Sequence, residues 1–171
     1  MDPVMIVFSG LPGSGKSTLS RLLAQDTGAT YIRIDEIEQA LRDANAPGTD
    51  IGAAGYVQGY ARAGQALSEG RPVIADAVNA VEIARQGWRQ VARTHAVAII
   101  EIEITCSDPD AHRRRLEDRN TDVPGLHAVS WEQARLRPFE PNPHLDIQLD
   151  TSGQTPSQSL AALKQQLVLK A

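Results

Sequence analysis

The sequence predicts an α/β fold, a three-layer sandwich in which helices cover both faces of a five-stranded parallel sheet. Three observations lead to this prediction. Short apolar runs alternate along the chain with segments of helical periodicity, which is the pattern of β-α-β units. The first apolar run ends in Ser9-Gly10, as is typical of a buried parallel strand. The length of 171 residues suits one domain, residues 1–171, better than two.

Five apolar runs predict the strands. The third run closes in Asp76, and in the fourth run Glu101 and Glu103 alternate with isoleucines, so they lie on the opposite face of that strand. The predicted strands are residues 4–8, 30–34, 73–76, 96–104 and 145–149. Because crossovers between parallel strands are right-handed, only a few doubly wound topologies fit this order of elements.

The segments between the strands carry helix periodicity and helix start and stop signals. Gly28 suits a helix C-terminus, and Asp108 followed by Pro109 suits a helix N-terminus. The segment 52–69 has helical spacing, but its four glycines argue against one straight helix. The predicted helices are residues 16–28, 35–44, 52–69, 81–93, 109–120, 131–137 and 157–169.

Charge and composition narrow the class of protein. The formal charge of -4 disfavours a surface that coats nucleic acid, although it leaves room for a nucleotide or a short strand in a local basic pocket. The single cysteine, Cys106, forms no internal disulfide and fits a reducing compartment. The N-terminus lacks the features of a signal peptide, and the longest apolar run, 96–100, is too short to span a bilayer. We therefore expect a cytoplasmic protein with no membrane partner, and its oligomeric state is left open.

The strongest motif is a glycine-rich loop between the first strand and the first helix. It matches the pattern G-x-x-x-x-G-K-[ST], in which inward-pointing backbone amides and a helix N-terminus bind phosphates. The lysine would reach the β- and γ-phosphates, and the serine hydroxyl would bind Mg²⁺. The sequence therefore predicts that ATP and Mg²⁺ are bound here. The predicted nucleotide-binding residues are Gly10, Leu11, Pro12, Gly13, Ser14, Gly15, Lys16, Ser17 and Thr18.

The loop, together with Ile34-Asp35 after the second strand, resembles the small P-loop kinases of the AAA_33-like group. That group includes the kinase domains of polynucleotide kinases, the zeta toxins and chloramphenicol phosphotransferase, and more distantly gluconate and adenylylsulfate kinases. The resemblance covers roughly residues 4–151. It implies a P-loop NTPase sandwich with strand order 2-3-1-4-5, a helical lid at about residues 112–138, and ATP-dependent phosphoryl transfer.

Two aspartates follow predicted strands at the edge where ligands bind in open parallel sheets. Asp35 would accept the proton of the attacking hydroxyl, and the resemblance implies the same role; alternatively it caps the next helix, with Glu38 completing a capping box. Asp76 would hold Mg²⁺ with Ser17 and line the substrate site; alternatively it caps a helix or bonds the glycine-rich loop.

The segment from Val73 to Ala80, with Arg85 six residues after Asn79, is similar to the Thr-Asn-Pro…Arg segment of polynucleotide kinases. The resemblance implies that Asn79 and Arg85 contact the acceptor or a phosphate. Here the triplet is Val-Asn-Ala, and the arginine that nucleic-acid kinases carry three residues after the aspartate is missing. These two departures weaken a polynucleotide substrate but not the kinase class.

Four arginines lie close together in the predicted helix 109–120. Arg115 and Arg119 are four residues apart and share a face, a spacing that resembles the lid arginines of nucleotide kinases. They would neutralise charge on the transferring phosphoryl group; the alternative is a solvated face paired with neighbouring carboxylates. The four histidines have no metal-site spacing and are expected on the surface or in loops.

The leading hypothesis is an ATP-dependent kinase that phosphorylates a hydroxyl of a small molecule. The alternatives within the class are a polynucleotide or nucleotide kinase and a sugar-nucleotide kinase of the zeta-toxin type. The alternative of another class is a regulatory switch that binds and hydrolyses ATP. The acceptor, the preference for ATP over GTP and the lid arginine that contacts phosphate do not follow from the sequence.

Overall fold

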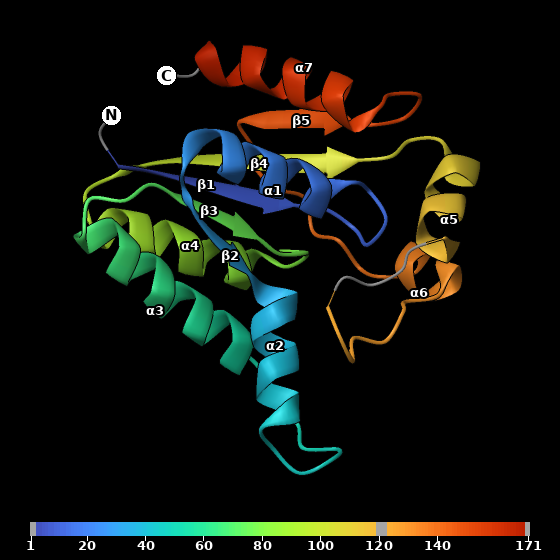
Figure 1. Cartoon of the computed structure of the whole chain (residues 1–171), viewed down its shortest axis with the longest axis horizontal. Coiled ribbons are helices and arrows are strands. Elements are labelled where there is room, and N and C mark those ends of the chain that lie inside the picture. Colours follow the sequence, from blue (N-terminus) through green and yellow to red (C-terminus); the bar gives the residue numbers. More distant parts are fainter. Residues whose placement is uncertain (1–2, 119–122, 170–171) are drawn as a thin grey trace.

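The structure, a computed structural model, describes residues 3–118 and 123–169. Within these residues five strands form one sheet in the order β2-β3-β1-β4-β5, and all neighbouring strands are parallel (Figure 1). The predicted α/β sandwich and its strand order are therefore confirmed. The strands are β1 (Val4–Ser9), β2 (Thr30–Arg33), β3 (Val73–Asp76), β4 (Ala98–Thr105) and β5 (Ile147–Asp150).

Helices cover both faces of this sheet. Helices α1 and α7 pack together on one face, α3 and α4 pack on the other, and α2 packs against α3 (Figure 1). Helices α5 and α6 lie beyond the end of the sheet. The helices are α1 (Lys16–Thr27), α2 (Ile34–Asp43), α3 (Ala54–Ser68), α4 (Glu82–Thr94), α5 (Pro109–Glu117), α6 (Trp131–Arg135) and α7 (Pro156–Val168).

The alternation of side chains along the central strand β1 divides the core into two halves. Met5 and Val7 face the α3 and α4 side, whereas Ile6 and Phe8 face the α1 and α7 side. Because β1 is buried on both faces, its residues form a continuous apolar run rather than an alternating one. Its carboxyl end is thereby held rigidly, and the glycine-rich loop begins there.

Several local predictions can be compared with the structure. Gly28 adopts a left-handed conformation at the end of α1, and Asp108 caps α5, as predicted. The capping role of Asp35 is wrong, because α2 begins at Ile34 and Asp35 already lies in its first turn. The helix predicted over 52–69 forms over Ala54–Ser68, and Gly55, Gly59 and Gly64 do not interrupt it.

Among the residues that the structure describes, no helix combines the length and the apolar character needed to cross a membrane.

Candidate active site

The glycine-rich loop connects β1 to α1, as the sequence predicts. Gly10 has φ 148°, and a Cβ added there would collide with the backbone oxygen of Ile104 on the neighbouring strand β4. Gly15 has φ 96° directly before the first residue of α1. Glycine is therefore required at both ends of the loop for its backbone to curl around an anion.

Lys16, Asp76 and Tyr31 form a buried polar group behind this loop. Lys16 Nζ donates to Asp76 Oδ1 at 2.6 Å, and the Tyr31 hydroxyl donates to Asp76 Oδ2, also at 2.6 Å. Burial alone would raise the pKa of Asp76, but the charge of Lys16 and the hydrogen bonds from Lys16 and Tyr31 lower this pKa on balance. Burial and the negative charge of Asp76 raise the pKa of Tyr31, so its phenol stays protonated and remains a donor.

Ser17 and Asp76 together fit a Mg²⁺ ion that arrives with a nucleotide. The Ser17 hydroxyl lies 3.4 Å from Lys16 Nζ, and a hydrogen bond from Ser17 is among the causes that lower the pKa of Asp76. The two side chains thus present a hydroxyl and an ionised carboxylate in one place. Mg²⁺ at phosphate sites usually takes only one or two oxygen ligands from protein and the rest from phosphates and water.

The main cavity of about 870 Å³ opens in front of the loop. Its size lies within the range of ligand pockets, roughly 300–1,000 Å³. At one end it is lined by Gly13, Gly15, Lys16, Ser17 and Thr18, and elsewhere by Arg33, Asp35, Glu38, Gln39, Arg42, Arg115 and Arg137. One continuous cavity therefore joins the loop to α2 and to the segment that follows α6.

Asp35 lies in this cavity at the first turn of α2, just beyond the end of β2. Its side chain is 28% exposed, and its Oδ2 lies 4.0 Å from Arg33 Nη2. Arg33 is itself buried and lies 3.8 Å from the Asp76 carboxylate. A solvent-accessible carboxylate therefore lines the same cavity as the phosphate loop.

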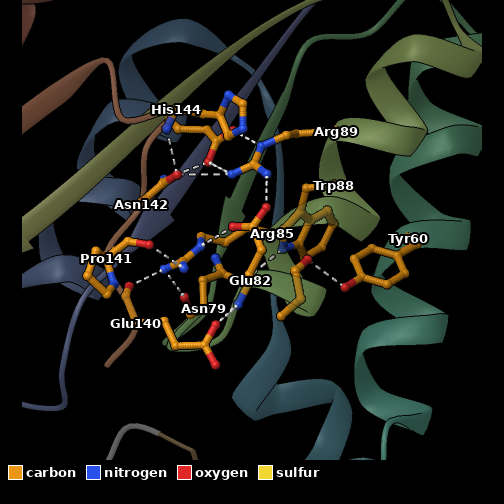
Figure 2. A network of polar contacts seen from close by, with 12 residues as sticks. Tyr60, Asn79, Glu82, Arg85, Trp88, Arg89, Glu140, Pro141, Asn142 and His144 are labelled. Atoms are coloured by element: carbon orange, nitrogen blue, oxygen red, sulfur yellow. Dashed lines mark hydrogen bonds and ion pairs between the residues drawn. The ribbon is translucent and has the colours of Figure 1, made fainter. Parts of the chain in front are cut away.

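Asn79 and Arg85 are placed differently, because both side chains are buried and neither lines the main cavity. Asn79 donates to the Phe8 carbonyl at 2.9 Å and accepts from Trp88 Nε1 at 2.9 Å. Arg85 donates to the carbonyl oxygens of Asn79, Glu140 and Pro141, at 3.2, 2.9 and 3.1 Å (Figure 2). The Asn79 side chain thus joins the loop after β3 to β1 and α4, and the Arg85 side chain joins that loop to the segment before β5. A contact of either residue with substrate stays a prediction.

Arg115 lies on the cavity wall and is fixed to the start of the β5–α7 loop. Its guanidinium donates to Thr151 Oγ1 at 2.6 Å and to the Thr151 carbonyl at 2.8 Å. The Thr151 hydroxyl is also 2.8 Å from the Ser14 carbonyl, so the glycine-rich loop, β5 and α5 meet at this threonine. Arg119, the second predicted lid arginine, lies outside the described residues.

Two residues at the site were not singled out by the sequence. Tyr31 orients Asp76, as described above, and His112 Nε2 lies 2.7 Å from the Pro12 carbonyl. His112 is buried and packs edge-on against Trp131 with ring centroids 5.2 Å apart, so the expectation that all histidines are on the surface or in loops is wrong for this residue. Because the carbonyl accepts, the ring must carry its proton on Nε2.

Comparisons with known proteins are consistent with this geometry. A family model described as an AAA domain, AAA_33, matches residues 5–139. A search of curated protein sequences returns no match.

Solved structures share the fold over nearly the whole chain. A proposed kinase from Chloroflexus aurantiacus is similar with a TM-score of 0.77 and 21% identity, covering 99% of this chain and 98% of the other. The Mycobacterium tuberculosis APS kinase CysC, in complex with AMPPNP and APS, has a TM-score of 0.66 and 16% identity over 97% and 98% of the chains. A gluconokinase from Sinorhizobium meliloti 1021 has a TM-score of 0.63 and 18% identity over 99% and 98%.

Proposed function

Because this chain belongs to the AAA_33 family of AAA domains, we propose that it is an ATP-dependent kinase acting on a hydroxyl of a small molecule. The observation that supports this most directly is the single cavity that is lined by both the phosphate loop and Asp35. Its volume suits a nucleotide with a small second substrate. The APS kinase structure holds AMPPNP and APS, so the shared fold accommodates a nucleotide analogue together with a second molecule.

At the nucleotide end, the loop amides and Lys16 bind the phosphates of ATP. Lys16 leaves Asp76 for the γ-phosphate as the nucleotide enters, which exchanges one anionic partner for another. Ser17 and Asp76 would hold Mg²⁺, which would supply positive charge to the phosphates.

At the acceptor end, Asp35 orients the hydroxyl and accepts its proton as the hydroxyl oxygen bonds to the γ-phosphorus. The bond between the γ-phosphorus and the β,γ-bridging oxygen breaks, and ADP leaves. Arg115 lines the cavity beside Gly15 and adds positive charge at the nucleotide end. The roles of Arg119 and of a lid at 112–138 remain predictions of the same proposal.

The test is an ATP-consumption screen against hydroxyl metabolites, antibiotics and nucleic-acid ends. For an acceptor that stimulates consumption, Asp35→Asn should lower kcat by about 10²–10⁴-fold, the usual contribution of a general base. Glu36→Gln is the matched control, because Glu36 is the next carboxylate in the same turn but does not line the cavity.

A different result would favour the regulatory switch. ATP hydrolysis that no acceptor stimulates, and that Asp35→Asn leaves unchanged, would contradict the kinase and support a protein that hydrolyses ATP as a signal.

A further inference from the structure

The charge of the main cavity is opposite to that of the whole chain. Among the residues that the structure describes, six basic side chains line it against two carboxylates, although the chain has a formal charge of -4. One of these cations, Lys16, is matched by the buried Asp76. The basic residues are Lys16, Arg21, Arg33, Arg42, Arg115 and Arg137, and the acidic residues are Asp35 and Glu38.

A nucleotide with its Mg²⁺ neutralises positive charge mainly at one end of this cavity. Lys16 belongs to the phosphate loop and contacts Asp76 there, and the guanidinium of Arg115 lies beside Gly15 of the same loop. The second end, formed by α2 and the segment after α6, has its own arginines. Arg42 pairs with Glu38 at 3.2 Å, and Arg33 lies within 4.0 Å of the carboxylates of Asp35, Glu36 and Asp76. Among the described residues, no carboxylate pairs with Arg137 at this end.

Arg137 lines the same cavity as Asp35 and Glu38 of α2. Burial raises the pKa of Glu38 and the pKa of Tyr56, and the positive charge of Arg137 partly opposes both of these increases. Within residues 3–118 and 123–169 its guanidinium forms no hydrogen bond or ion pair, whereas the neighbouring Arg135 pairs with Glu132 at 3.1 Å. An exposed arginine without a protein partner at the wall of a cavity is suited to bind an anion.

The backbone that carries Arg137 is held in place by the network in Figure 2. Three residues farther along, the amide of Glu140 donates to the Ala80 carbonyl at 2.8 Å, and Arg85 holds the carbonyls of Glu140 and Pro141. The side chain thus starts from a fixed point and needs little reorganisation to meet a ligand.

We propose that the acceptor carries an anionic group as well as its hydroxyl, and that Arg137 binds this group opposite Asp35. The inference rests on the proposed kinase function and names the chemical class of the acceptor: a hydroxylated carboxylate, sulfate or phosphate ester. Arg137 is then the residue that distinguishes such an acceptor from a neutral polyol of the same size, because a neutral molecule leaves its guanidinium without a partner.

The first arm of the test compares acceptors that differ in one charge, gluconate with sorbitol and glycerate with glycerol, in ATP-dependent phosphorylation. We expect turnover of an anionic member only, and Arg137→Ala should raise its KM at least tenfold while the KM for ATP changes less than twofold. Arg137→Lys should recover part of the lost affinity for the acceptor, since lysine keeps the positive charge but lacks the planar guanidinium that donates two hydrogen bonds to one anionic group. Arg135→Ala is the matched control and should behave as the wild type. Equal turnover of a neutral partner would overturn the inference while leaving the kinase function intact.

The second arm does not depend on turnover and therefore separates the two proposals. Radiolabelled sulfate is dialysed against protein saturated with Mg-AMPPNP, so that the phosphate loop is filled. We expect binding that Arg137→Ala weakens at least fivefold and that Arg135→Ala leaves within twofold. No binding of sulfate, or equal loss in the two variants, would overturn the inference even if the protein proves to be a kinase. Retained binding without any phosphorylation would instead count against the kinase function alone.

Discussion

Lys16 and Asp76 depend on each other, because both are buried and each neutralises the other's charge. Removing one member of a buried pair costs about 3–5 kcal/mol, and Arg33, at 3.8 Å from Asp76, is too far away to replace the 2.6 Å contact with Lys16. We expect Lys16→Ala to lower the free energy of unfolding by about this amount, and Lys16→Ala with Asp76→Asn to recover most of it. Urea unfolding of both variants measures the difference. A double variant no more stable than the single one would contradict the coupling.

Glu38 should make stability depend on pH in the direction opposite to most carboxylates. Burial raises its pKa above the usual 4.5, more than Arg42 lowers it. Because folding raises this pKa, the folded state binds the proton of Glu38 more tightly than the unfolded state does. The free energy of unfolding therefore falls as the pH rises above 4.5 and Glu38 ionises. Glu38→Gln should therefore have a higher Tm than the wild type near pH 7, and the two curves should converge near pH 4. Thermal unfolding across this range, with the exposed Glu36→Gln as control, tests the sign.

Residue identities at the site follow from the sequence only where the signal is local. Lys16 and Ser17 belong to a contiguous motif, and Asp76 closes a recognisable strand. Tyr31 and His112 join the site through contacts with residues 45 and 100 positions away, so no local pattern marks them. Asn79 matched a family motif, but the motif does not reveal that its side chain bonds Phe8 and Trp88 inside the protein.

At the level of elements, the glycines of α3 serve close packing rather than flexibility. A Cβ on Gly59 would collide with the end of the Ile34 side chain and lie 3.1 Å from Trp88, whereas one on Gly64 would meet only the edge of His95 at 3.0 Å. Helix propensity alone made these glycines appear unfavourable. The tight contact of α3 with α2 and α4 explains why the helix is nevertheless continuous.

The two glycines should therefore respond differently to alanine. Gly59→Ala should destabilise the protein by about 1–3 kcal/mol, because overpacking outweighs the gain in helix propensity. Gly64→Ala should be neutral or stabilise by up to about 1 kcal/mol, because the His95 side chain can move aside. Chemical denaturation of both variants measures the contrast. Equal effects would show that propensity, not packing, controls this helix.

For the molecule as a whole, two of the three arginines of α4, Arg85 and Arg89, hold the chain segment that returns from α6 to β5. Arg85 bonds two carbonyls of this segment, and Arg89 pairs with Glu101 and donates to Asn142 at 3.0 Å (Figure 2). The parallel α/β sheet could be predicted from the alternation of elements, but the strand order came only from the resemblance to small P-loop kinases, because crossover handedness leaves several topologies open. The contacts of Arg85 and Arg89 with this segment could not be predicted from the sequence, because they join irregular backbone to a helix more than 50 residues earlier.

Arg85→Ala should consequently weaken the whole fold rather than one helix. The carbonyls it leaves behind lose buried donors, at about 1–3 kcal/mol each. Arg93→Ala, an exposed change on the same helix, should alter stability by less than about 0.5 kcal/mol. Hydrogen exchange should show lost protection in both the α4 and β5 regions for Arg85→Ala. Loss confined to α4 would contradict a role in joining the two.

Helix α5 is tied down at two points, by His112 on the Pro12 carbonyl and by Arg115 on Thr151. If the predicted lid moved about a hinge at the start of this helix, both attachments would have to break. The two attachments therefore fix α5 to the glycine-rich loop at one point and to the start of the β5–α7 loop at the other. A displacement of α5 as a body would separate this wall of the cavity from both loops at once.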